Sequence, residues 1–232
     1  MSPRHMDREI DKLKKKILAL SAVVEGSVQR ATQALSARDA ALAQEVIDRD
    51  EEIDNAEVDV EEECLKLLAL YQPVATDLRY IIAILKINND LERVGDEAVN
   101  IAERVVFLAH QERFDIPFDF QLMSDKTQAM LRNSLDALVN SHAGLAHQVG
   151  LADDEVDDLN RQMYVWVQRA IREHPERVEP LIHLLSISRH LERIADYATN
   201  IAEDVIYLID GEIVRHKVEA FQLLLPDSSS EP

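Results

Sequence analysis

Cysteine, glycine, proline and aromatic residues are all scarce in this chain of 232 residues. A single cysteine, Cys64, excludes an intramolecular disulfide and is typical of a reducing compartment, so we expect a cytoplasmic location. Only 5 glycines and 7 prolines are present to interrupt helices, whereas 47% of the residues are apolar. This composition predicts helix over most of the chain and enough apolar surface for a packed core.

Long apolar runs are absent as well. The most apolar stretch, residues 78–87, is interrupted by Arg79 and Lys86, so the sequence predicts no membrane-spanning helix. The charged residues 1–16 do not resemble a secretory signal. If the protein works at a membrane, we expect partners to recruit it there.

Basic residues are outnumbered by acidic ones. The sequence has 25 lysines and arginines and 44 aspartates and glutamates, which gives a net charge of −19. Nucleic-acid phosphates would repel such a chain, which excludes DNA or RNA as a partner. Cations or basic proteins are the natural counterparts, although solubility alone also explains an acidic surface.

Signature motifs of common enzymes are missing. The sequence has no glycine-rich phosphate loop, no Gly-x-Ser-x-Gly, no cysteine pair and no His-Glu-x-x-His. It also has no Glu-x-x-His, which di-iron enzymes of the ferritin type carry on their bundle helices. We expect a protein that is not an enzyme, and a carboxylate-bundle metalloenzyme is the disfavoured alternative.

The spacing of apolar residues is helical from Asp7 to about Leu208. Pro73 and Pro175 predict the starts of the third and sixth helices, because proline fits the first helical turn. Asp39 and Asp153 are candidate N-caps. Five breaks separate six long predicted helices, at residues 37–39, 72–73, 111–121, 150–153 and 174–175.

An internal repeat is the strongest feature of the sequence. Residues 85–112 and 185–212 align without gaps, and half of the aligned positions are identical, including polar ones. A fainter match aligns residues 50–54 with 153–157. The repeat predicts an all-α protein of two tandem three-helix bundles related by a pseudo-twofold axis. The predicted divisions are a first bundle (1–113), a linker (114–121), a second bundle (122–212) and a partly disordered C-terminal tail (213–232).

Carboxylates and amides recur at helical spacing in both halves. At about 100° per residue, the polar residues of 92–103 share one face of their helix, and Val94, Ala98, Ile101, Val105 and Leu108 lie on the opposite arc. Like charges one turn apart destabilise a helix unless cations neutralise them. Oxygen ligands without thiolate suit Mg²⁺, Mn²⁺, Ca²⁺ or carboxylate-bridged iron. The candidate metal ligands are Asp50, Asp54, Glu57, Glu92, Asp96, Asn100 and Glu103, then Asp153, Asp157, Glu192, Asp196, Asn200 and Glu203.

Two other interpretations of the acidic residues stay open. The strips could be solvated helix faces, or Arg93 and Arg193 could pair with the carboxylates and leave no room for a metal. A metal-free helical adaptor that binds a basic partner would fit that case.

The sequence resembles the PhoU family over roughly residues 4–216. The resemblance rests on LERVGDEAVNIAE at 91–103 and its duplicate, on QPVATDLR at 72–79 and on YLIDGEIVRH at 207–216. It implies two three-helix bundles whose acidic motifs bind iron, zinc, magnesium or manganese. It also implies a negative regulator of phosphate uptake and of the phosphate-starvation response, one that associates with the phosphate ABC transporter and with a PhoR-type sensor histidine kinase, as a homodimer or higher oligomer. The implied location is the cytoplasm, peripheral to the inner membrane through these partners.

The second half does not copy every carboxylate of the first. Asn160 stands where the first half has Glu57, and Tyr197 stands where it has Glu97. The second site would then have fewer anionic ligands, and we expect it to bind metal more weakly than the first.

Overall fold

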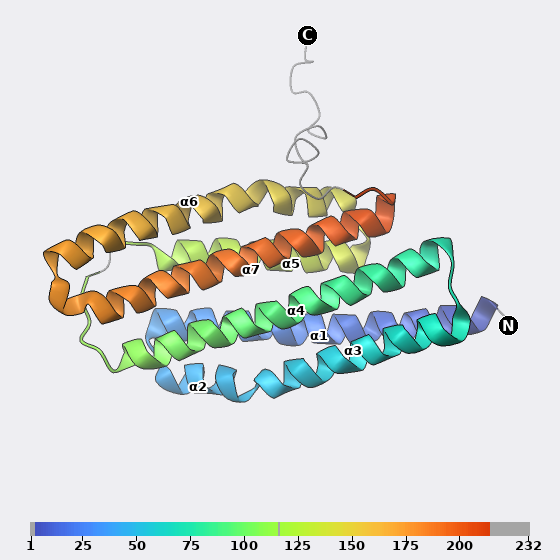
Figure 1. Ribbon diagram of the computed structural model, residues 1–232, viewed down its shortest axis with the longest axis horizontal. Helices are drawn as coiled ribbons and strands as arrows, with labels where there is room; N and C mark the ends of the chain where they lie inside the picture. Colours follow the sequence, from blue (N-terminus) through green and yellow to red (C-terminus); the bar gives the residue numbers. More distant parts are fainter. Residues whose placement is uncertain (1–2, 116, 214–232) are drawn as a thin grey trace, which may run out of the picture.

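The computed structural model describes residues 3–115 and 117–213, and these residues form helices joined by short connections. The prediction of an all-α protein is confirmed (Figure 1). The described elements, in chain order, are α1 (Pro3–Ala37), α2 (Ala40–Asp48), α3 (Asp50–Tyr71), α4 (Ala75–Ala109), α5 (Phe120–Asn140), α6 (Ala143–Glu173), the 3₁₀ turn η1 (Pro175–Arg177) and α7 (Val178–Asp210).

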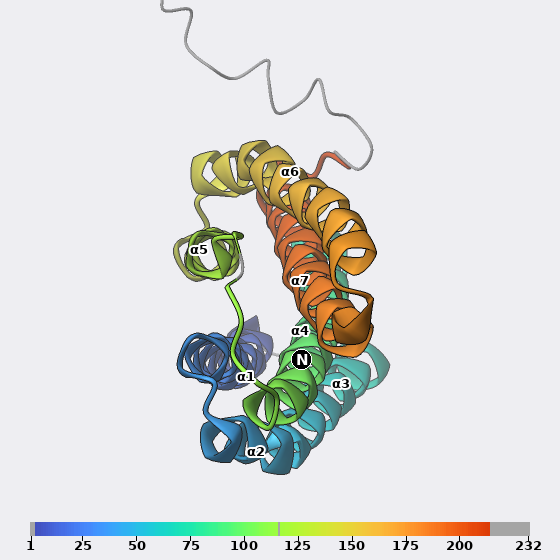
Figure 2. The same cartoon turned by 90° about the vertical axis from the view of Figure 1, so that its left-hand side faces the viewer.

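The helices form two bundles, one from each half of the chain (Figure 2). In the first bundle α2 and α3 together take the place of one long helix. They are separated at Arg49, whose φ of −97° and ψ of 1° are not helical. The predicted pair of three-helix bundles is therefore confirmed, with the second helix of the first bundle divided.

The duplicated helices α4 and α7 pack against each other at the centre of the molecule. Lys86 contacts Asp204, Glu97 contacts Arg193, and Phe107 stacks on His183. As the residue number rises along α4 it falls along α7, so the two helices run antiparallel. Antiparallel packing of two copies of one sequence produces the pseudo-twofold relation between the halves.

The apolar face of α4 is buried as the helical spacing predicts. Val94, Ala98, Ile101, Val105 and Leu108 are each at most 1% exposed. Burial of a side chain such as Ile101 contributes roughly 1.5–3 kcal/mol. The polar face of the same helix is thereby fixed outward, toward α3 and solvent.

The two predicted N-caps have different outcomes. Asp39 caps α2, because its side chain accepts hydrogen bonds from the main-chain N–H groups of Ala41 and Leu42. Asp153 is not a cap, and the predicted break at 150–153 is wrong: α6 continues from Ala143 to Glu173. Gly150 costs an interior helix about 1 kcal/mol, which burial of the neighbouring Val149 offsets.

The break between the first two helices of the second half falls earlier, at 141–142. Ser141 adopts a left-handed conformation with φ of 50°, and His142 caps α6 by accepting from the N–H of Leu145. Ser141 corresponds to Arg38, which ends α1 with φ of 52°, at the same offset that aligns 50–54 with 153–157. The duplication therefore extends to this turn.

The two prolines lie just before the helices that they were expected to start. Pro73 belongs to the connection before α4, where Val74 is extended with φ of −130°, so α4 begins at Ala75. Pro175 opens the 3₁₀ turn η1, and α7 follows from Val178. Each helix therefore begins two or three residues after its proline, because proline restricts its own φ and disfavours helical geometry in the residue before it.

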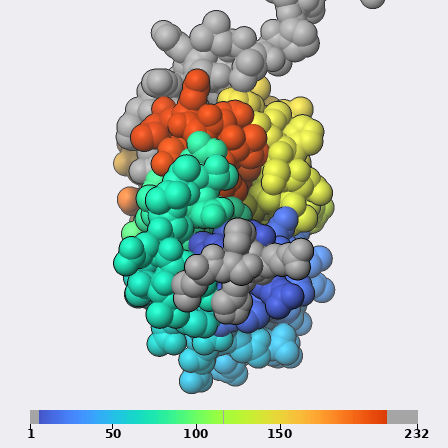
Figure 3. Space-filling model, turned by 90° about the vertical axis from the view of Figure 1, so that its right-hand side faces the viewer, coloured from blue at the N-terminus to red at the C-terminus, as the bar shows by residue number. Residues whose placement is uncertain are grey.

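The connection between the halves runs from residue 110 to 119, and α5 already begins at Phe120. The predicted C-terminal tail, 213–232, lies outside the described residues except for Ile213. Figure 3 views the end of the molecule where α3 joins α4 and where α7 ends. Arg79 lies against Gly211 there, and the φ of 77° at this glycine ends α7.

The prediction that the sequence lacks a membrane span agrees with the helices of residues 3–115 and 117–213. None of them combines the length and the apolar character that crossing a membrane requires.

Candidate metal centre

Helices α3 and α4 bring five of the predicted ligands together. Asp50 and Asp54 on α3 interact electrostatically with Asp96 on α4, and Glu57 interacts with Glu92. We call these five carboxylates the first acidic face. The helical spacing of the sequence placed the residues of each helix on one side, and the fold brings the two sides together.

The close approach of α3 and α4 depends on Gly95. A Cβ atom at this position would lie 3.0 Å from Cδ1 and 3.2 Å from Cγ2 of Ile53. The second half has the smaller Val156 and an alanine, Ala195, at the equivalent positions, both buried. Compared with the first half, the second half has a smaller side chain on its second helix and a larger one on its third. The close contact between the two helices, next to the acidic residues, is thus kept in both halves.

Burial is the main influence on the first acidic face. It raises the pKa of Asp50, Glu57, Glu92 and Asp96, and neighbouring carboxylates raise each pKa further. Because burial and neighbouring charge both oppose ionisation, binding of a proton or a cation would stabilise these carboxylates. The face is therefore electrostatically unfavourable on its own at neutral pH.

A second acidic face lies between α6 and α7, built from Asp153, Asp157, Glu192 and Asp196. Burial raises the pKa of Asp153 to about 6, and Asp196 and Asp157 contribute further. Burial also raises the pKa of Asp196 to about 6, followed by the charges of Glu192 and Asp157. The pKa of Glu192 is raised as well, chiefly by burial.

Each face has a polar neighbour that the sequence analysis did not identify. Nδ2 of Asn88, a buried residue of α4, donates to Oε1 of Glu57 at 2.7 Å. In the second half Oγ of Ser188 donates to Oδ1 of Asn160 at 2.9 Å. The repeat alignment pairs position 88 with 188, one turn before the first glutamate of each motif, and this spacing is the signal that could have found them.

The remaining predicted ligands lie further along α4 and α7. Asn100 and Asn200 are half-buried one turn beyond Asp96 and Asp196, and Glu203 is half-buried two turns beyond. Glu103 is 51% exposed and accepts from Arg104 at 2.8 Å. These residues continue the polar strip of each helix toward its C-terminal end.

The arginines of the repeated motif do not fill the acidic faces. Nη1 of Arg193 lies 2.9 Å from Oε1 of Glu97, and Nδ1 of His190 lies 2.6 Å from Oε2 of the same carboxylate. Nη1 of Arg93 is 3.8 Å from Asp90 on its own helix. In the second face Arg161 does approach Asp157, at 3.6 Å.

The donor chemistry fits a hard cation. Both faces offer carboxylate oxygens whose ionisation is opposed by burial and by like charge, which a cation would relieve. The side chains are not already arranged around one point, however. Within 3–115 and 117–213, no group of three or more His, Cys, Asp or Glu side chains has the geometry to hold a metal ion. Binding would require rotation of carboxylate side chains.

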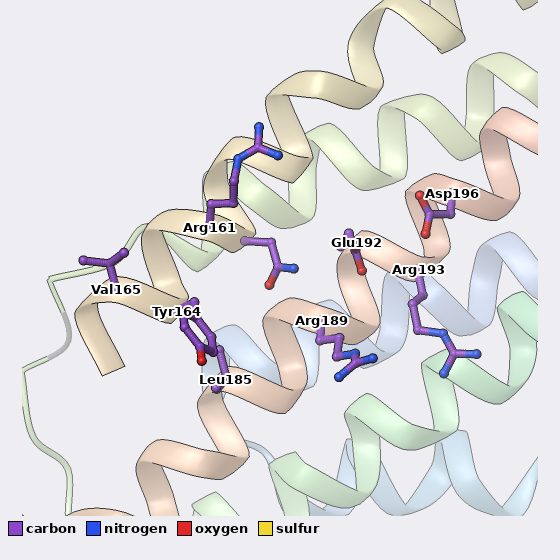
Figure 4. Close-up of a pocket in the computed structure, with 9 residues that line it drawn as sticks. Arg161, Tyr164, Val165, Leu185, Arg189, Glu192, Arg193 and Asp196 are labelled. Carbon is purple, nitrogen blue, oxygen red and sulfur yellow. The ribbon is translucent and has the colours of Figure 1, made fainter. Parts of the chain in front are cut away.

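A groove of about 810 Å³ adjoins the second face (Figure 4). Tyr164, Val165 and Leu185 form its apolar wall, and Glu192 and Asp196 lie at its other end. The first half has Glu61 and Glu62 where the second has Tyr164 and Val165. The two acidic faces therefore open on surroundings of different chemistry.

Two helical bundles of one ancestry, each with an acidic face between its second and third helices, define a class of internally duplicated helical proteins. The chain belongs to the PhoU family. The PhoU domain matches it twice, at residues 17–105 and 120–205.

Several relatives resemble the chain over most of its length. The phosphate-specific transport system accessory protein PhoU homolog of Aquifex aeolicus is 40% identical over 210 residues, which cover 90% of this chain and 95% of the relative. The crystal structure of PhoU from Pseudomonas aeruginosa has a TM-score of 0.85 at 35% identity, covering 89% of this chain and 99% of that one. The structure of the phosphate transport system regulatory protein PhoU from Streptococcus pneumoniae has a TM-score of 0.80 at 30% identity, covering 90% and 99%.

Proposed function

We propose that this protein is a non-enzymatic accessory regulator of phosphate transport. Relatives similar over about nine-tenths of the chain are named phosphate-specific transport system accessory proteins, which supports this role. The absence of enzyme signature motifs from the sequence supports a protein that acts by binding.

In the finer form of the proposal the protein represses both phosphate uptake and the phosphate-starvation response. It acts as an adaptor between the phosphate ABC transporter and a PhoR-type sensor histidine kinase on the cytoplasmic side of the inner membrane, as a homodimer or higher oligomer. An adaptor needs two different surfaces. The exposed Glu61 and Glu62 in one half, and the groove of Tyr164 and Val165 in the other, offer such surfaces.

The metal part of the proposal rests on one observation, which is that both halves carry a partly buried acidic face at the equivalent place. Magnesium, manganese or iron suits these oxygen donors better than zinc, which more often takes nitrogen or sulfur ligands. A bound cation would neutralise charges that repel each other and so stabilise the pairing of the helices. The residues that would hold it are Asp50, Asp54, Glu57, Glu92 and Asp96 in the first face, and Asp153, Asp157, Glu192 and Asp196 in the second.

A metal-free adaptor is the second candidate function. It is favoured by the side-chain arrangement, because no metal-holding group is formed among the residues that the structure describes. In that case a basic segment of a partner would take the place of the cation on the acidic faces. Elemental analysis of the purified protein separates the two candidates, since stoichiometric metal excludes the second.

Gene deletion tests the regulatory role. Alkaline phosphatase activity in phosphate-rich medium should rise when the gene is deleted and fall again when the wild-type gene is restored. Restoration with D54N/D96N, which removes two carboxylates of the first face, tests whether the metal face contributes. Repression that is unchanged by the deletion would remove the assignment.

A further inference from the structure

A second cavity, of about 410 Å³, lies where the two bundles and their connection meet. Its walls come from the ends of α1 and α4, the start of α5 and the first half of α7. It shares no residue with the acidic faces. Its apolar lining consists of Leu35, Val105, Leu108, Phe118, Phe120 and Leu184.

Two arginines line this cavity without a carboxylate partner. Arg38 donates from Nη1 to the carbonyl of Leu108 at 3.5 Å, and Arg113 donates from Nη2 to the carbonyl of Ala37 at 3.3 Å. No ion pair involves either arginine in the described part of the chain. A guanidinium carries five N–H donors, so most donors of both remain available to a ligand.

The positive charges of the two arginines also repel each other. Burial, followed by the charge of Arg113, lowers the pKa of Arg38 from its ordinary value. The turn itself does not require arginine, because Ser141 has the same left-handed conformation at the equivalent turn of the second half. An anion between the two guanidiniums would offset both the burial of Arg38 and the repulsion between the two charges.

The other polar residues of the cavity are already engaged. The carboxylate of Asp119 accepts from the N–H of Leu122 at 2.9 Å and so caps α5. Gln121 accepts from Oγ of Ser36 at 2.9 Å and donates to Asp125 at 2.8 Å. The lining therefore carries two positive charges, from Arg38 and Arg113, against the one negative charge of Asp119, in a chain whose net charge is −19.

We propose that this cavity binds a small organic anion, a phosphate monoester or a carboxylate that carries an apolar group. The anionic end would lie between Arg38 and Arg113, and the apolar end against Phe118 and the aliphatic wall. Because the lining comes from both bundles and from their connection, the ligand would hold the two halves together. This inference does not depend on metal binding.

Calorimetric titration of the full-length protein in chelator tests the proposal, with phenyl phosphate, benzoate, inorganic phosphate and phenol as probes. Saturable binding of phenyl phosphate or benzoate supports the proposal, and their ranking distinguishes phosphate from carboxylate. Inorganic phosphate and phenol should bind at least about tenfold more weakly, since each lacks one half of the recognised group. Equal binding of phenol would overturn the anionic part, and equal binding of inorganic phosphate the apolar part.

Three variants locate the binding. R38S copies the serine of the equivalent turn, and R113Q removes the second charge. Each should weaken phenyl phosphate binding about tenfold or more, since charge-assisted hydrogen bonds are lost. R172S, at an exposed arginine of α6 that does not line the cavity, should bind like wild type, and thermal unfolding checks that all variants fold. Wild-type affinity in both R38S and R113Q, or no saturable binding by wild type, would overturn the proposal.

Discussion

The two acidic faces differ in charge and in burial, and the two differences act in opposite directions. The first face has five carboxylates, whereas the second has four, with Asn160 in the place of Glu57. Yet the large pKa shifts belong to the second face, where burial raises the pKa of Asp153 and Asp196 to about 6. Burial is the first cause of both shifts, and the charges of neighbouring carboxylates come after it.

The halves also differ where they meet. Glu97 is only 3% exposed and lies between His190 and Arg193, so it belongs to the contact between α4 and α7. At the counterpart position in the same contact, the Cζ atoms of Arg93 and Arg193 each lie 6.0 Å from the centroid of the Tyr197 ring. The exchange of Glu97 for Tyr197 therefore changes the contact between α4 and α7, and the prediction of weaker metal binding by the second face depends on Asn160. Duplicated positions diverge when one copy of a helix must pack on the other.

The largest effect is expected for the central contact. E97A leaves the partly buried His190 and the half-exposed Arg193 without their carboxylate, and we expect the free energy of unfolding to fall by about 2–3 kcal/mol. E103A is the matched control, because it removes an exposed pair with Arg104 and should cost less than about 1 kcal/mol. Urea denaturation measures both. Equal losses would mean that Glu97 does not hold the halves together.

The packing of the first face comes next. G95A should lower the free energy of unfolding by about 1–2 kcal/mol, because the contact with Ile53 outweighs the better helix propensity of alanine. Adding I53V, which reproduces the valine and alanine of the second half, should recover most of that loss. G26A has only a side-chain contact at 3.4 Å and should stabilise α1. A G95A variant as stable as G26A would show that the helices do not touch tightly there.

Exchange of one ligand should make the metal affinities of the faces converge. E57Q should weaken Mn²⁺ binding to the first face about tenfold, and N160E should strengthen binding to the second by a similar factor, because affinity follows ligand charge. Each is titrated in a background that disables the other face, D157N/D196N or D54N/D96N. Unchanged affinities would show that Glu57 and Asn160 do not take part in metal binding.

A smaller effect concerns pH in metal-free protein. The pKa of Asp196 is about 6 when folded and 3.8 in its ordinary state, so its protonation adds stability that is full below about 3.8 and lost as pH rises through about 6. D196N should therefore be more stable than wild type at pH 7.5, with an advantage that disappears toward pH 4. E45Q, at an exposed residue of α2, should stay within about 0.5 kcal/mol of wild type. A pH-independent advantage of D196N would contradict the raised pKa.

The fold was largely predictable because the strongest signals in the sequence are periodic. Helical spacing and the repeat specify the helices, their buried face and their grouping into two bundles. The break at 150–153 was wrong because Gly150 and Asp153 are ordinary break signals that buried neighbours override. The turn at Ser141 depends on one left-handed residue, which only the alignment with Arg38 reveals.

The acidic faces were predictable one helix at a time. Spacing along α4 places Glu92 and Asp96 on one side, but it cannot say what the neighbouring helix presents to them. The roles of Asn88 and Glu97 depend on contacts between helices, with α3 and α7 respectively. Such contacts follow from packing rather than from local pattern, so the sequence could not assign them.

Metal content after equilibrium dialysis shows whether cations occupy the two acidic faces. Wild-type protein, D54N/D96N, D157N/D196N and the fourfold variant are dialysed against limiting and saturating Mn²⁺, and bound metal is measured by mass spectrometry. We predict that wild type binds metal at both faces, that each double variant keeps only the metal of its intact face, and that the fourfold variant keeps none. Metal-free wild type, or a fourfold variant with as much metal as wild type, would contradict the account.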